Sequence, residues 1–168
     1  RAYPGSFIFN YAALEITGTG VPTYARLVYP AFWIIAMIVS WYAFICKLFS
    51  QHVAFTSTLL AIPGLHFLHL HPSPESAGII LTLSALILLI TRRDMKGKIT
   101  GLLVILALLI THPVSPLILI VFLVATNAAG LLFRDVKAPI TILMPFLIGI
   151  GWFTWVIYYS VKIGFNIL

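Results

Sequence analysis

The sequence predicts an all-α fold, a polytopic transmembrane bundle of about six spans with broken or short helices near its outer side. Hydrophobic residues make up 61% of the 168 residues and charged residues only 8%, whereas soluble domains carry about 25% charged residues. The mean hydropathy is +1.10. Long apolar runs alternate with short polar loops, as expected when each bilayer crossing needs about 20 apolar residues.

Charge and cysteine content exclude several classes of protein. The formal charge of +6 is interpreted as topological, because basic residues collect in the cytoplasmic loops of membrane proteins; no nucleic-acid partner is predicted. The single cysteine, Cys46, excludes an internal disulfide. The chain begins at Arg1 without an initiator Met or a signal peptide. We therefore expect it to be the central piece of a longer membrane protein.

Residues 1–23 are expected to be the end of an extracytoplasmic loop with one short helix, and residues 24–168 the helical bundle. Ser6 is a suitable N-cap for the short helix, and Gly18 and Gly20 would end it. Pro63 should bend the second span, whereas the run 73–75 is a good helix entry. The spans are predicted near residues 24–47, 53–70, 76–91, 99–111, 116–133 and 139–161.

Basic residues fix the predicted direction of the spans. Lys47, the bases of the loop 92–98 and those of the loop 134–137 fall at every second boundary, and the histidine clusters fall at the alternate ones. The positive-inside rule then places the basic loops in the cytoplasm. We expect an integral, multi-pass protein of the cell membrane whose histidine clusters lie on the extracytoplasmic side.

The predicted span 99–111 is unusually short. It would reach about 20 Å across a hydrocarbon core of roughly 30 Å. His112 and Ser115 should therefore lie below the outer surface, where irregular backbone is tolerated only inside protein or beside a wet cavity. The sequence predicts a recessed, outward-facing cavity whose walls include these two residues and the loop 66–75.

The segment 64–75 carries His66, His69, His71 and Glu75, a set of side chains that could bind metal. Their spacing does not favour a metal site, because His71 leaves the face shared by the other two histidines and no His-Glu-x-x-His motif is present. No metal ligand is assigned. Two interpretations remain open: histidines that hydrogen-bond headgroups, water or helix ends, and histidines that bind an anionic ligand such as a lipid phosphate.

His112 and Arg26 each have a structural and a functional interpretation. Pro113 and Pro116 break the chain after His112, so His112 or Thr111 could satisfy freed carbonyls, or His112 could serve a ligand. Arg26 could reach the interface as a solvated base or clamp a phosphate. The sequence contains no P-loop, nucleophile elbow or serine–histidine catalytic motif.

Several short runs stand out together: 3–9 with 16–18, 24–27, 71–76 followed by an apolar helix ending at 92–93, and 111–115. Together they resemble the GT-C superfamily of polytopic glycosyltransferases, which use polyprenyl-phosphate-linked sugar donors. The resemblance implies a membrane enzyme that transfers a sugar on the extracytoplasmic side, with the membrane lipid and the lipid-linked sugar as partners.

The resemblance also implies roles for individual residues. Arg26 and the histidines would face the donor phosphate or sugar, and Glu75 would orient the substrate. Tyr3 and Ser115 join them as substrate-binding candidates. The catalytic base is not assigned and is expected upstream of Arg1; any divalent metal would belong to the full-length enzyme.

Two other functions fit the sequence. Broken helices with recessed polar groups also mark transporters and channels, although no internal repeat is visible. A non-catalytic scaffold subunit with membrane-protein partners is the third interpretation. Ala125 and Ala129 have the small-xxx-small spacing of close helix contacts, as do Thr126 and Gly130.

Overall fold

The computed structural model describes residues 4–68, 73–92, 94–132 and 142–165, and this part of the chain is helical, without a strand. The all-α prediction is confirmed for these residues. In chain order the elements are α1 (Pro4–Thr17), α2 (Val21–Thr23), the π-helix η1 (Tyr24–Val28), α3 (Tyr29–Leu48), α4 (Gln51–Leu68), α5 (Pro74–Thr91), α6 (Met95–Thr111), α7 (Ser115–Leu132) and α8 (Leu143–Phe165).

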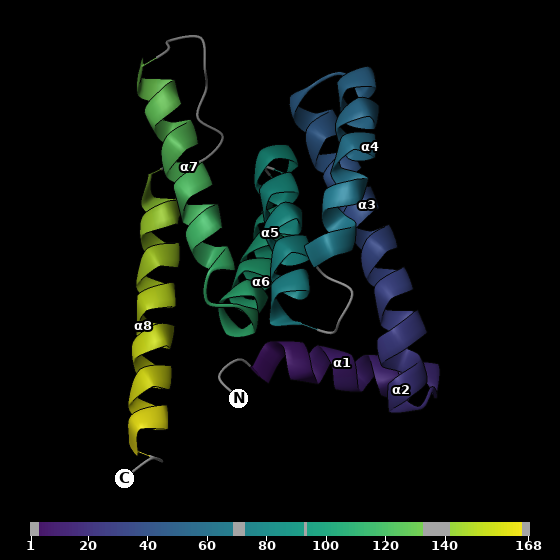
Figure 1. The fold of residues 1–168 in the computed structure, drawn as a ribbon. Helices are drawn as coiled ribbons and strands as arrows, with labels where there is room; N and C mark the ends of the chain where they lie inside the picture. The colour runs from purple at the N-terminus through teal and green to yellow at the C-terminus, as the bar shows by residue number, and fades with distance from the viewer. Residues whose placement is uncertain (1–3, 69–72, 93, 133–141, 166–168) are drawn as a thin grey trace.

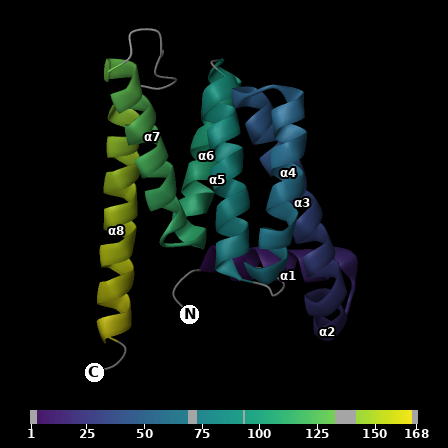
Figure 2. The same cartoon turned by 45° about the horizontal axis from the view of Figure 1, so that its top comes forward.

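The long helices pack as consecutive pairs, α3 with α4, α5 with α6 and α7 with α8, while α5 also contacts α3 and α7. Both views show α1 lying across one end of the bundle (Figure 1, Figure 2), where it packs on α5 and α6. The first turns of α5 and α7 and the last turns of α4 and α6 lie at this end (Figure 1). The connection 48–51, the last turn of α5 and the first turn of α6 lie at the opposite end (Figure 1).

The outside of the bundle is apolar and several polar side chains are inside. Large hydrophobic side chains are exposed along the described helices, among them Leu131 at 87% and Ile16 at 85%. Thr58 and Thr82 are buried and donate to the carbonyls of Ala54 and Gly78 at 2.7 and 2.8 Å. Soluble proteins rarely expose so much contiguous apolar surface. A lipid environment accounts for this distribution.

Among the described residues, three helical stretches are long and apolar enough to cross a membrane: Val21–Leu48, Pro74–Thr91 and Ser115–Leu132. This composition supports a membrane protein. The remaining three predicted spans are not confirmed by the same criterion, and Leu143–Tyr159 is a shorter apolar helix.

The short N-terminal helix ends as predicted but begins earlier. Gly18 adopts a φ of +61°, a left-handed conformation that favours glycine, and its N–H donates to the carbonyl of Leu14 at 2.9 Å. This is a glycine stop at the helix C-terminus. The predicted N-cap was wrong, because α1 begins at Pro4 and Ser6 lies inside its first turn.

The predicted start of the short span at Ile99 was also wrong. Asp94 takes the N-cap position and α6 runs from Met95 to Thr111, a helix of 17 residues that is about 25 Å long at 1.5 Å per residue. The basic residues Lys96 and Lys98 therefore belong to the helix and not to a loop. About half of the length deficit that placed His112 below the surface therefore disappears.

Candidate functional site

The start of α5 lies directly against the turn between α6 and α7. A Cβ atom at Gly78 would collide with the Ser115 hydroxyl and would lie 2.9 Å from the Cβ of His112. Only glycine lets the two segments approach this closely. Segments that are more than 30 positions apart in the sequence thus form one polar end of the bundle, which we call the polar end cluster: Tyr29, Ser73, Glu75, Ser76, His112 and Ser115.

Three buried side chains hold the first turn of α5 on α3. Ser73 is the N-cap of α5, and its side chain accepts from the Ser76 N–H at 3.4 Å. The two serine hydroxyls lie 2.9 Å apart, and the Tyr29 hydroxyl lies 2.5 Å from that of Ser76. Because buried hydroxyls are costly unless they are paired, this chain of contacts fixes where α5 begins. It confirms the predicted helix entry at residues 73–75.

The second half of the polar end cluster is the α6–α7 turn. The Ser115 N–H donates to Nδ1 of His112 at 3.2 Å, and the Ser115 hydroxyl lies 2.8 Å from the same nitrogen. A backbone N–H can only donate, so Nδ1 must carry a lone pair and the neutral ring carries its proton on Nε2. From α8, the indole N–H of Trp152 donates to the Pro113 carbonyl at 2.7 Å and fastens the turn.

These contacts indicate the chemical roles of His112 and Ser115. Ser115 is only 1% exposed, so its hydroxyl cannot reach a substrate as a nucleophile; it positions the imidazole. Burial in the turn lowers the pKa of His112 from its usual value, and the Glu75 carboxylate partly opposes this. The imidazole is therefore neutral near pH 7, with its Nε2–H as a donor and the exposed Glu75 carboxylate as an acceptor on the neighbouring helix.

The other predicted site residues are not all brought to this place. Arg26 is exposed on η1, and its assignment to a phosphate gains no contact from the described residues. His66 lies in the last turn of α4, whereas Tyr3, His69 and His71 lie outside the described residues. Within the described part of the chain, no group of three His, Cys, Asp or Glu side chains is placed to hold a metal ion.

An apolar cavity of about 400 Å³, here called the α1 cavity, lies between α1, α3, α5 and α6. Tyr29 and Thr111 line it, whereas His112 and Ser115 do not, so it differs from the polar cavity that the sequence predicts. The sequence does not predict it, because the small residues Gly5, Ala36, Ala77 and Ala107 lie on four different helices and no local pattern indicates that these helices become neighbours. The full lining is Gly5, Ile8, Phe9, Tyr29, Phe32, Trp33, Ala36, Ala77, Ile80, Leu81, Ala107, Ile110 and Thr111.

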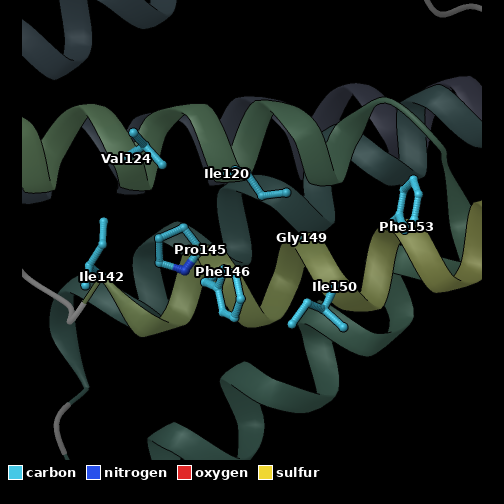
Figure 3. A pocket seen from close by; sticks show the side chains of 8 residues that line it. All are labelled: Ile120, Val124, Ile142, Pro145, Phe146, Gly149, Ile150 and Phe153. Carbon is cyan, nitrogen blue, oxygen red and sulfur yellow. The ribbon is translucent and has the colours of Figure 1, made fainter.

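A second apolar pocket, of about 500 Å³, lies between α7 and α8, and Figure 3 shows the residues that line it. Its lining contains no ionisable side chain. Ile120 and Val124 come from α7, and Pro145, Gly149 and Phe153 are among those from α8. It offers no polar group that could fix or activate a substrate, and we place no chemistry there.

Comparison with known proteins adds no assignment: no protein-family model, curated protein or solved structure matches this chain. The resemblance to GT-C glycosyltransferases is therefore carried only by the short sequence runs.

The neutral His112 predicts an acid-sensitive fold. The imidazole has a pKa of about 6.5 in the unfolded chain and a lower one in the folded chain. Between these two values the unfolded state binds more protons, so stability rises with pH. The contribution is complete above pH 6.5 or so and is lost as the pH falls through the folded pKa. Thermal unfolding in mild detergent should show this loss in the wild type.

His112→Asn should flatten that part of the pH profile, because Asn does not titrate but its side-chain oxygen can still accept from the Ser115 N–H. His52→Asn, at an exposed position at the start of α4, is the matched control and should keep the wild-type slope. Equal slopes in the wild type and the His112→Asn chain would contradict the assignment.

Proposed function

We propose that the chain is the membrane part of a GT-C-like glycosyltransferase that transfers a sugar from a polyprenyl-phosphate-linked donor on the extracytoplasmic side of the cell membrane. The observation that carries the proposal is the polar end cluster, in which the predicted Glu75 and His112 come together. It is supported further by the apolar outer surface of the helices, which suits a lipid-linked substrate.

The chemistry of the cluster fits a sugar better than a bare anion. Sugar hydroxyls both donate and accept, and the pair offers the Nε2–H of His112 and the carboxylate of Glu75. A carboxylate repels a phosphate but accepts from a hydroxyl. In the proposed reaction the bond between the anomeric carbon and the phosphate oxygen breaks, and the polyprenyl phosphate leaves with the bonding electron pair. A bond from the anomeric carbon to the acceptor oxygen forms, and the acceptor hydroxyl loses its proton. His112 and Glu75 bind and orient the sugar, and no base is assigned.

The proposal includes six spans and a fixed orientation. The helices α3–α8 alternate in direction (Figure 1), so Lys47, Arg92 and Lys96 lie at the end opposite Glu75 and His112. Basic residues collect on the cytoplasmic side. The polar end cluster is then extracytoplasmic, with α1 lying along that surface.

The orientation is tested by single cysteines in a chain whose native Cys46 is replaced by alanine. Glu75 and Met95 are both exposed and lie at opposite ends of the bundle. In intact cells a membrane-impermeant maleimide should label the Glu75→Cys chain, whereas the Met95→Cys chain should react only after the cells are opened. Labelling of both chains in intact cells would overturn the shared extracytoplasmic site.

Donor binding tests the function. The full chain in lipid nanodiscs should bind a polyprenyl-phosphate-linked hexose, and loss of one hydrogen bond to a charged or polar group should weaken binding by about tenfold in His112→Asn and in Glu75→Gln. The matched controls are His52→Asn and Asp94→Asn, at the opposite end of the bundle, which should bind as the wild type does. Binding is measured by titration with a fluorescent donor.

Absence of donor binding by the wild type would reject the glycosyltransferase proposal and leave the transporter and scaffold interpretations. If the wild type binds the donor and neither His112→Asn nor Glu75→Gln weakens this binding, the donor is a ligand of the protein. In that case the polar end cluster is not its binding site.

A further inference from the structure

We propose that the α1 cavity holds one acyl chain of a bilayer phospholipid, which enters from the side of the bundle beneath α1. The proposal goes beyond the proposed sugar transfer and does not depend on it. It rests on the lining of the cavity, on the exposure of its edge and on the state of its polar atoms.

The edge of the α1 cavity faces the surroundings of the bundle. Ile8, Phe9 and Phe32 belong to its lining and are also exposed, by 64%, 43% and 54%. Phe9 and Phe32 face each other across the boundary between α1 and α3, with ring centroids 6.2 Å apart. An opening bordered by exposed apolar side chains gives access from lipid and offers a polar ligand no path of approach.

The inner wall of the cavity is different, because it is deeply buried. Trp33 is only 2% exposed although it lines the cavity. Ala36, Ala77 and Ala107 come from α3, α5 and α6, and their short side chains leave the space open. A larger side chain at any one of them would fill part of it.

The side-chain hydroxyls of the lining are engaged by the protein. The Thr111 hydroxyl donates to the carbonyl of Ala107 at 2.6 Å, and the Tyr29 hydroxyl is hydrogen-bonded to that of Ser76. The other polar side-chain atom of the lining is the indole nitrogen of Trp33, deep in the wall. Because water needs at least two polar partners to occupy a cavity, an apolar chain is the occupant that suits these largely apolar walls.

The apolar lining also indicates which molecule supplies the acyl chain. Because the lining is largely apolar and contains no charged side chain that would select a particular headgroup, the chain with the highest local concentration fills the cavity by mass action. In a bilayer that is a phospholipid acyl chain. A filled cavity also recovers the dispersion contacts that an empty one loses, which fastens α1 to the bundle.

The experiment places the full chain in nanodiscs of phosphatidylcholine brominated in the middle of its acyl chains, because bromine quenches tryptophan on contact. The Trp33 contribution is the difference between the wild type and Trp33→Phe, which removes the background of the other tryptophans. We expect Trp33 emission to be lost in brominated lipid and present in plain lipid. Since Trp33 is buried, a chain within the cavity should quench it more strongly than chains at the outer surface, and variants that fill the cavity distinguish the two.

Larger side chains that fill the α1 cavity should restore the Trp33 emission. Ala107→Leu and, independently, Ala36→Leu should restore Trp33 emission in brominated lipid. The matched control is Ala31→Leu, an exposed alanine on α3 that is not part of the lining and should leave the quenching unchanged. If both filling variants fail to fold, the comparison of the wild type with Trp33→Phe still decides the question.

Two results would overturn the proposal. Equal Trp33 emission in brominated and plain lipid would show that no acyl chain enters. Relief of quenching by added polyprenyl phosphate at low molar ratio would show that the cavity selects an isoprenoid chain over the bulk phospholipid.

Discussion

The close approach of α5 to the α6–α7 turn at Gly78 is the contact on which the rest of the polar end depends. With no side chain at this position, the Ser115 hydroxyl occupies the space that a Cβ would take. His112 is held through Ser115, and the Glu75 carboxylate comes within electrostatic reach of the imidazole. The constraint is steric and local, but its consequence is an assembly from three segments of the chain.

The contact at Gly78 belongs to a bundle that is apolar on its outside and carries several polar side chains inside. In an apolar surround, helices gain little from burying apolar side chains against each other, so small residues and internal hydrogen bonds carry more of their association. Gly5 against Thr111 and Gly78 against Ser115 are contacts of this kind. The Tyr29–Ser76–Ser73 chain supplies the hydrogen bonds.

Much of the fold follows from the sequence for physical reasons. Composition alone predicts membrane helices, and the glycine stop at Gly18 and the proline entry at Pro74 are local signals that the structure confirms. The start of α6 was placed one turn late because charged residues were taken to end a helix, whereas Lys96 and Lys98 lie in its first turn. Charged residues indicate where the chain leaves the apolar layer, but a helix can continue beyond that point into water.

The site could be predicted only in part. Length and polarity indicate that Glu75 and His112 lie near helix ends, but the periodicity of apolar residues cannot say which helices become neighbours. The α1 cavity is invisible to sequence reasoning for the same reason, because Ala36, Ala77 and Ala107 meet only after four helices have packed. The role of Ser115 as the partner of His112 follows from a three-residue spacing that is common in turns and carries no chemical signature alone.

Replacement of Gly78 tests the assembled polar end most directly. Gly78→Ala places a Cβ 2.9 Å from the Cβ of His112 and against the Ser115 hydroxyl, whereas Gly101→Ala, the matched control inside α6, meets its nearest side-chain atoms at 3.9 Å. Because overpacking a tight contact costs about 1–3 kcal/mol, Gly78→Ala should unfold at a lower temperature than the wild type in mild detergent, and Gly101→Ala should not. Equal unfolding temperatures for the two variants would contradict the account.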